Sequence, residues 1–312
     1  WRALETGGDT LPEAAPPEAI EVLQHTLRVP SPERLGDLFK ALAAGEQPAH
    51  LSELTGIDPW FLHQMQRITD FDRGLHGARW NDALVRKAKR LGFSDRHLAA
   101  RLGLKETEVR RHRLAAGIQP VMKAVDTCGA EFKAETPYFY STYEDECEVP
   151  EPTRPRILIL GSGPNRIGQG LEFDYCCVQA ALELKSRGYD VLLANSNPET
   201  VSTDYDISTR LYFEPLTAED VLNIVDIEKP LGVIVQLGGQ TPLKLARALH
   251  EAGVPLLGTP YDGLDLAENR ARWRDLVNEL GLKQPDSRIA GTREESLGFA
   301  EQLGYPVLAR PS

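Results

Sequence analysis

Residues 156–170 read RILILGSGPNRIGQG and join a run of branched apolar residues to a glycine-rich turn. The apolar run is typical of a strand that is buried on both faces. A glycine-rich turn between a strand and a helix often lets the backbone come close to a ligand. On the glycines alone, a ligand site and a tight structural turn are equally good interpretations.

Strands and helices are expected to alternate after this turn. The predicted strands are 191–194, 211–213, 232–236 and 255–257, and the predicted helices are 171–187, 217–228 and 242–252. Such alternation with continuous apolar strands predicts a parallel sheet that helices cover on both faces. Two amphipathic helices at 268–281 and 292–303 and a strand at 306–309 predict the start of a further domain.

The chain before this sheet is expected to be helical, because apolar residues recur there at helical spacing. The predicted helices are 18–28, 31–45, 58–68, 80–91, 95–102 and 105–116, and glycines at 45, 92, 103 and 117 are expected to end four of them. Residues 118–155 lose this periodicity and are rich in proline, tyrosine and acidic residues. They predict a linker that lies against the neighbouring domains.

The composition bounds the class of protein. Of 312 residues, 41% are hydrophobic and 26% charged, with a net charge of -11, which disfavours general nucleic-acid binding and fits a globular protein. The absence of an apolar run of eighteen residues predicts no membrane span. Four cysteines without zinc-site spacing predict reduced thiols and a cytoplasmic location. Because the chain starts at Trp1 and stops at Ser312, directly after an apolar run, we interpret it as part of a longer protein.

Two common phosphate-binding motifs do not fit the glycine turn. A dinucleotide fingerprint needs G-x-G-x-x-G, but the position of its third glycine holds Arg166, and the next strand runs into Asn195 without the ribose-binding acid. A phosphate loop of the Walker type needs Gly-Lys followed by Ser or Thr, whereas Gln169 and Gly170 follow Gly168 here.

Three loops are predicted to meet at one edge of the sheet, because the carboxyl ends of parallel strands share an edge. They are residues 161–170, 195–206 and 237–241. With the start of the helix after the first loop, they carry Asn165, Arg166, Glu172, Asn197, Glu199, Thr200, Ser202, Thr203, Asp204, Gln236, Gln240 and Thr241. Any one of these side chains is more often a cap than a catalyst. Together on one edge, they favour a site.

Several strings closely resemble the carbamoyl-phosphate synthetase large-subunit family. They are GPNRIGQGLEFDYCC, NSNPETVSTDYD, LYFEPLTAEDVL, GVIVQLGGQTPLKLA, GTPYDGLDLAENR and the linker VDTCGAEFKAETPYFYSTYEDE. The resemblance runs from Trp1 to Ser312 and is strongest over 124–270. It implies a multi-domain chain: an all-α oligomerisation domain (1–123), a linker (124–155), a Rossmann-like pre-ATP-grasp α/β domain (156–267) and the truncated beginning of an ATP-grasp domain (268–312).

The resemblance also implies a function. The family makes carbamoyl phosphate from bicarbonate, ATP and ammonia from glutamine, for pyrimidine and arginine synthesis, and this chain matches the start of the half that phosphorylates carbamate. ATP with Mg²⁺ is then expected, with Mn²⁺ as an alternative and K⁺ as a further ion. The glutaminase small subunit and further copies of the chain are the expected partners. The family's metal ligands lie beyond this sequence, so no metal site and no complete catalytic set are expected, and the fragment alone should be inactive.

The resemblance implies candidate roles for eight residues. Arg270 and Arg310 match arginines that lie at the nucleotide in the family. Gly170 and Glu172 match residues of the path by which carbamate arrives. Asn165, Arg166, Asn197 and Gln240 are further candidates at the loop edge. The alternatives on the residues alone are a solvated helix charge for Arg270 and helix–sheet packing for Gly170.

Residues 94–117 offer a competing interpretation. They read SDRHLAARLGLKETEVRRHRLAAG, which fits a helix-turn-helix with Arg110, Arg111 and Arg113 on its second helix. On that interpretation the protein would be a DNA-binding module fused to an α/β ligand-binding domain. Two short helices are also a common packing unit, and Glu106 and Glu108 are spaced to pair with these arginines. Another ATP-grasp enzyme, such as a biotin carboxylase or a purine-pathway ligase, is disfavoured because it would lack the helical domain.

Overall fold

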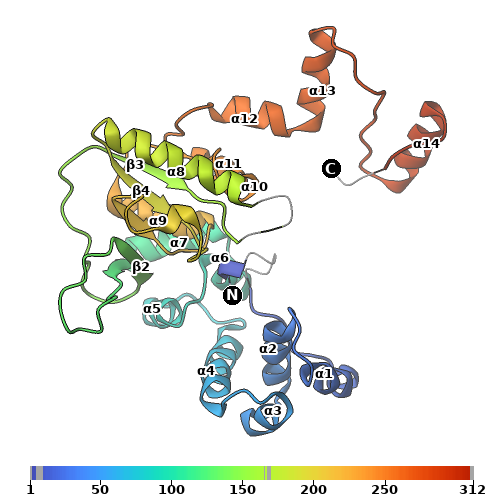
Figure 1. Ribbon diagram of the computed structural model, residues 1–312. Helices are drawn as coiled ribbons and strands as arrows, with labels where there is room; N and C mark the ends of the chain where they lie inside the picture. The colour runs from blue at the N-terminus through green and yellow to red at the C-terminus, as the bar shows by residue number, and fades with distance from the viewer. Residues whose placement is uncertain (1, 5–9, 165, 167–169, 310–312) are drawn as a thin grey trace. The chain divides into compact units, whose positions relative to one another are not determined.

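The computed structural model describes residues 2–4, 10–164, 166 and 170–309. It divides into two compact units, Trp1–Leu245 and Ala246–Ser312, which are described separately. The first unit holds a helical part and an α/β part, and the second is helical (Figure 1).

The helical part begins the first unit and confirms the predicted all-α start. Its elements are η1 (Arg2–Leu4), η2 (Pro17–Ala19), α1 (Ile20–Leu27), α2 (Arg34–Ala44), α3 (Pro48–Thr55), α4 (Pro59–Leu75), α5 (Asp82–Arg90), α6 (Asp95–Leu102) and α7 (Glu106–Ala115). Side-chain oxygens of Asp58, Asn81 and Ser94 accept backbone N–H groups at the starts of α4, α5 and α6. Helix α3 was not predicted, because it is only eight residues long and buries a single large apolar side chain, Leu51.

Two apolar cores hold these helices together. Leu27, Leu42 and Leu62 belong to a core built by α1 to α4. Val85 and Leu98 belong to a second core that runs from the end of α4 through α7. Each core removes mainly aliphatic surface from water, which is the main favourable term in folding.

The α/β part is a six-stranded sheet with strand order β1-β2-β5-β4-β3-β6. Its strands are β1 (Val121–Ala124), β2 (Tyr138–Thr142), β3 (Arg156–Leu160), β4 (Asp190–Ala194), β5 (Arg210–Tyr212) and β6 (Val233–Ile234). Its helical elements are α8 (Leu171–Ser186), η3 (Val201–Thr203), α9 (Ala218–Glu228) and α10 (Gln240–Leu243). The strand pairs are parallel except β1–β2, so the sheet is mixed and the predicted all-parallel sheet was wrong in this respect.

The antiparallel pair comes from an unexpected place. Strands β1 and β2 lie within or next to the segment that was predicted to be a linker. Phe139 is buried there and its ring lies 5.7 Å from that of Tyr212 in β5. The tyrosine-rich segment thus extends the sheet, and its aromatic side chains supply the apolar contact that makes this favourable.

The strand order places helices on both faces. Strand β3 runs beside β4 along its full length, from Arg156 opposite Asp190 to Leu160 opposite Ala194. Because the chain moves from β3 to β4 in one direction and from β5 to β6 in the other, right-handed crossovers put α8 and α9 on opposite faces (Figure 1). The order reverses between β3 and β6, and ligands bind at such points in sheets of this kind.

The second unit contains α11 (Ala246–Glu251), α12 (Tyr261–Glu268), α13 (Arg270–Glu279) and α14 (Arg293–Leu303). The His250 and Tyr261 rings stack at 4.6 Å, and Arg272 pairs with Asp262 and Asp265. The predicted helix 242–252 is divided into α10 and α11, and α12 was not predicted. Within the described residues no strand forms at 255–257 or 306–309, where only Leu256 makes an isolated bridge.

Candidate functional site

The three loops that were predicted to share an edge follow β3, β4 and β6, as expected. We call these loops, together with the first turn of α8, the loop edge. Two glycines bring the first and third loops into contact: a Cβ added to Gly238 would lie 2.3 Å from the carbonyl oxygen of Gly161. A side chain at position 238 would therefore push the two loops apart. The close backbone approach explains the glycine at the point where the strand order reverses.

Asn195 ties the second loop to the first. Its side chain is fully buried at the end of β4, and its Oδ1 accepts the backbone N–H groups of Gly163 at 3.0 Å and Asn197 at 3.2 Å. Gly163 has a φ of +71°, which a residue with a side chain rarely adopts. The glycine loop is therefore held in shape by a buried amide of the neighbouring strand.

Asp174 ties α8 to the second loop. It is fully buried, and its Oδ2 accepts the hydroxyl of Thr200 at 2.6 Å and the backbone N–H of Ser202 at 2.7 Å. Its Oδ1 accepts the hydroxyl of Ser202. The first turn of α8 and the turn at 200–203 are thus joined by three hydrogen bonds to one carboxylate, which are stronger than bonds between neutral groups.

Two hydroxyl groups at this edge have no hydrogen-bond partner among the described residues. They belong to Ser162 in the glycine loop and Ser196 in the second loop, and the Ser162 residue is 3% exposed. A buried hydroxyl without a partner is costly, and such groups occur where a ligand or water completes the bonding. This is the polar character that a site for a small polar molecule requires.

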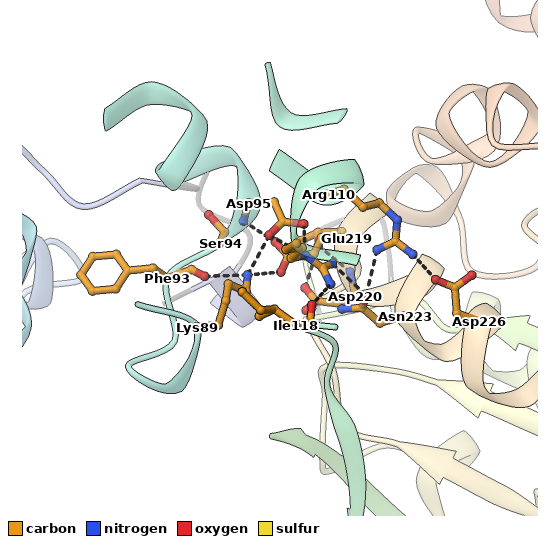
Figure 2. A network of polar contacts seen from close by, with 12 residues as sticks. Lys89, Phe93, Ser94, Asp95, Arg110, Ile118, Glu219, Asp220, Asn223 and Asp226 are labelled. Atoms are coloured by element: carbon orange, nitrogen blue, oxygen red, sulfur yellow. Dashed lines mark hydrogen bonds and ion pairs between the residues drawn. The ribbon is translucent and has the colours of Figure 1, made fainter. Parts of the chain in front are cut away.

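A second polar cluster, which we call the joint, connects the helical part to α9 (Figure 2). Lys89 of α5 donates to Asp95 Oδ1 at 3.0 Å and also pairs with Glu219 of α9. Arg113 of α7 donates to Asp95 Oδ2 at 2.7 Å. All four side chains are at most 4% exposed. The joint consists of Arg2, Lys89, Asp95, Arg110, Arg113, Glu219, Asp220, Asn223 and Asp226.

The remaining contacts of the joint also cross between the two parts. Arg113 Nη2 and Arg110 Nη1 donate to Asn223 Oδ1 at 3.0 and 2.8 Å. The guanidinium of Arg2 donates to Asp220 at 2.6 Å. Buried charges persist only where partners surround them, so these pairs fix the helical part against the start of α9.

The pKa values follow from this packing. Burial by itself would lower the pKa of Lys89, but the charges of Glu219 and Asp95 raise it above its ordinary value. Burial would raise the pKa of Glu219, but Lys89 and Arg2 lower it. Asp220 differs: burial raises its pKa to about 7, opposed by Arg2 and reinforced by the charges of Glu219 and Glu214. The joint therefore contains one carboxyl group that titrates near neutral pH.

The joint removes the support for the helix-turn-helix interpretation. Arg113 is fully buried against Asp95 and Asn223, and Arg110 binds Asn223 and Asp226. Figure 2 shows Arg110 pointing toward Asn223 and Asp226 of α9, and Arg113 Nη2 donates to the same Asn223. Arginines that are held in this way are not available to neutralise DNA phosphates.

Comparisons with known proteins agree with this architecture. Residues 1–117 match the family of the carbamoyl-phosphate synthetase large chain, oligomerisation domain, and residues 153–266 match the carbamoyl phosphate synthase preATP-grasp domain. The whole chain is 53% identical to a carbamoyl phosphate synthase large chain of Xanthomonas axonopodis pv. citri, over 29% of that protein's length. It is 51% identical to the one of Pseudomonas putida, over 30% of its length. The chain belongs to the carbamoyl phosphate synthase large-chain family.

A solved structure, the biotin carboxylase domain of a single-chain bacterial carboxylase, is also similar. It shares 20% identity, with a TM-score of 0.35 over 47% of this chain and 34% of that one. The synthase relatives match the entire chain, whereas the chain spans less than a third of their length. No helix among the described residues is long and apolar enough to cross a membrane.

Of the predicted site residues, the structure brings Gly170 and Glu172 into contact. Gly170 is the N-cap of α8, and its N–H donates to Glu172 Oε1 at 3.4 Å. Asn197 Oδ1 accepts the N–H of Glu199 at 3.0 Å, so its side chain is used as a cap. Arg166 and Gln240 are exposed, the latter at the start of α10. Asn165 lies outside the described residues.

The two arginines predicted at the nucleotide follow the loop edge in the sequence. Arg270 is the exposed first residue of α13, in the second unit. Arg310 lies outside the described residues. Their roles at a nucleotide therefore stay predictions from the resemblance.

The described residues do not form a metal site. No group of three or more His, Cys, Asp or Glu side chains within them could hold an ion. Divalent Mg²⁺ in ATP sites is bound through carboxylates and substrate phosphates.

Sequence reasoning missed three residues of the loop edge, two of them polar: Asp174 and Asn195. Asp174 shares the buried face of α8 with Cys177 and Ala181, so a signal was present: an acid at an apolar position of an amphipathic helix. Phe173 was missed too. Its ring lies against Gly239, where an added Cβ would be 3.3 Å from Cγ, and this contact joins α8 to the third loop.

Proposed function

We propose that the whole protein makes carbamoyl phosphate, and that this chain opens the half that phosphorylates carbamate with ATP. The observation that carries the proposal is the loop edge, whose three loops match the family's preATP-grasp domain over 153–266. A helical part that precedes this domain supports placement in the second half. The family is one of ATP-dependent ligases, and the use of glutamine as ammonia source is part of the proposal.

The chemistry assigns a role to each group of residues. Transfer of the γ-phosphoryl group of ATP to a carbamate oxygen yields carbamoyl phosphate and ADP. It requires in-line positioning and cations that stabilise charge on the transferring group. We assign Arg270 and Arg310 to the nucleotide. Gly170, Glu172, Asn197 and Gln240, with Asn165 and Arg166, are assigned to the path of the small polar substrate, where unsatisfied hydroxyls of Ser162 and Ser196 support such a use.

Assembly and location complete the proposal. Residues 1–123 would bind further copies of the chain, and the exposed, edge-to-face pair Trp60 and Phe61 on α4 supports an assembly surface there. A glutaminase small subunit would supply ammonia. Residues 124–155, 156–267 and 268–312 would be the linker, the pre-ATP-grasp domain and the start of the ATP-grasp domain. Free thiols at all four cysteines support a reducing, cytoplasmic setting.

The test is ATP formation from carbamoyl phosphate and ADP, which isolates the second half. The whole protein, of the length its relatives have, should make ATP, and the 312-residue chain should not. Arg310→Ala should lower the rate by about a hundredfold or more, as the loss of a charge-stabilising group does. Arg293→Ala, which removes an exposed arginine at the start of α14, is the matched control and should keep the wild-type rate. Absence of ATP formation by the whole protein would overturn the proposal.

A further inference from the structure

We propose that Asp174 is a positioning residue that sets the separation between the start of α8 and the loop after β4. This inference rests on the proposed function and deepens it, because these two segments carry Glu172 and Asn197. Asp174 does not touch the substrate in this view. It holds the two walls between which a small polar substrate would pass.

The first step of the argument is the acceptor chemistry at Asp174. Three donors converge on it: the Thr200 hydroxyl, the Ser202 N–H and the Ser202 hydroxyl. An ionised carboxylate is acceptor-only and can satisfy all three, whereas an amide would present N–H groups to one of them. The arrangement therefore selects a carboxylate at this position.

The second step is the cost of this choice. Asp174 is fully buried, and no ion pair to it occurs within the described residues. Burying a carboxylate costs free energy of desolvation, and here only hydrogen bonds offset it. Apolar side chains could pack a helix against a turn without this cost. Hydrogen bonds, unlike apolar contacts, fix direction and distance. The buried carboxyl group at this position therefore indicates that the distance and direction between α8 and the turn at 200–203 are what its hydrogen bonds fix.

The third step is the connection to the other loops. Ser202 Oγ, which donates to Asp174, accepts from Asn195 Nδ2 at 3.5 Å, and Asn195 Oδ1 holds the N–H of Gly163. A chain of hydrogen bonds thus leads from α8 to the glycine loop. One residue before Asp174, the ring of Phe173 meets Gly239 of the third loop. The first turn of α8 consequently contacts the second and third loops directly and is linked to the first loop through Ser202 and Asn195.

The test compares three variants of the whole protein in ATP formation from carbamoyl phosphate and ADP. Asp174→Asn keeps the volume but reverses one hydrogen bond, so the KM for carbamoyl phosphate should rise about tenfold. The KM for ADP should stay within about twofold, because the groups that bond to Asp174 are not those proposed to bind the nucleotide. Asp174→Ala should have the larger effect. Glu183→Gln removes an exposed acid that pairs with Arg187 on the same helix and should change neither constant.

A purely structural role would give a different result. It would lower the amount of folded enzyme, and hence kcat, without separating the two KM values. That result, or a wild-type KM for carbamoyl phosphate in Asp174→Asn, would overturn the inference.

Amide hydrogen exchange on the 312-residue chain tests the positioning role of Asp174 separately from the proposed function. If the whole protein makes no ATP, the hydrogen-exchange rates of Gly163 and residues 200–203 decide. Faster exchange confined to these amides in Asp174→Asn would support the positioning role, and unchanged exchange would overturn it.

Discussion

The joint and the loop edge are both buried polar networks, yet they are built differently. The joint pairs charges of both signs, and its contacts to α9 join residues far apart in sequence: Lys89 and Glu219 are separated by 130 positions, and Arg113 and Asn223 by 110. The hydrogen-bond network of the loop edge has one buried carboxyl group, Asp174, and its bonds span shorter distances in sequence, up to the 32 positions that separate Gly163 from Asn195. The joint connects two parts with separate cores, whereas the loop edge shapes the ends of adjacent strands.

The two networks also differ in how completely they are satisfied. Every charged side chain of the joint has a partner of opposite charge, while the buried hydroxyl of Tyr143, whose ring lies under Lys89, has no hydrogen-bond partner among the described residues. At the loop edge, Ser162 and Ser196 keep hydroxyls without a partner in the described part of the chain. In a network that serves stability, the polar groups have partners within the protein. In a network that serves binding, some donors or acceptors are left for a ligand. The comparison therefore predicts different responses to mutation.

Breaking the joint should have the largest effect. Lys89→Met leaves Asp95 and Glu219 buried without this cation, and the free energy of unfolding should fall by about 3–5 kcal/mol. Urea denaturation of the 312-residue chain, followed by circular dichroism, measures it. Lys87→Met is the matched control: this exposed lysine of α5 only lies over the Phe71 ring at 5.3 Å, so its loss should cost about 1 kcal/mol or less. Equal losses in the two variants would contradict the role assigned to the joint.

Overpacking the loop edge should have the next largest effect. In Gly238→Ala the new Cβ meets backbone atoms of Gly161, which cannot rotate away, so about 1–3 kcal/mol of unfolding free energy should be lost. Gly74→Ala in α4, where nothing lies within 4 Å of the added atom, should instead stabilise the chain by about 0.5–1 kcal/mol. A neutral Gly238→Ala would show that the two loops are not in close contact.

The pH dependence of stability should expose Asp220. Its pKa of about 7 in the folded chain exceeds its ordinary value of 3.8. The folded state therefore keeps a proton that the unfolded chain releases, and this contribution is lost as the pH rises toward 7. Thermal unfolding should show wild type losing on the order of 1–2 kcal/mol relative to Asp220→Asn between about pH 5 and pH 8. Asp226→Asn, at the exposed rim of the joint, keeps Asp220, so its stability should change with pH in parallel with that of wild type. If the curve of Asp220→Asn also runs parallel to that of wild type, the raised pKa of Asp220 is contradicted.

The smallest effect should come from an unsatisfied hydroxyl. Ser162→Ala removes a buried group without a partner among the described residues, so the unfolding free energy should stay within about 1 kcal/mol of wild type or rise. Ser202→Ala removes the hydroxyl between Asp174 and Asn195 and should cost about 1–3 kcal/mol. If both variants lose the same unfolding free energy, the Ser162 hydroxyl has a hydrogen-bond partner within the protein and is not free to bind a ligand.

Much of the fold was predictable because its signals are local. The apolar run at 156–160 and the glycines after it predicted β3 and the turn, and helical spacing predicted α8, α9 and most of the helical part. Strand β1 was missed because Val121 to Ala124 is short and has mixed polarity, and it becomes a strand only by pairing with β2. Long-range pairing of this kind leaves little trace in a single sequence.

The joint could not be predicted from sequence. Lys89 and Glu219 each stand on an amphipathic helix, where a charge normally faces solvent. Only the packing of α5 and α7 against α9 buries them. The loop edge was predicted in outline, since parallel strands deliver their loops to one side, but the buried acceptors Asp174 and Asn195 that shape it were not.

The helical part is fastened to the α/β part at several separate points. The chain itself passes from α7 into β1, Lys89 grips Glu219, and Arg90 Nε donates to the carbonyl oxygen of Tyr143 at 3.0 Å. Each of these connections has a different partner in the α/β part: strand β1, the start of α9 and the residue after β2. A force applied to the helical part would therefore strain bonds to the sheet and to α9 as well as the chain connection.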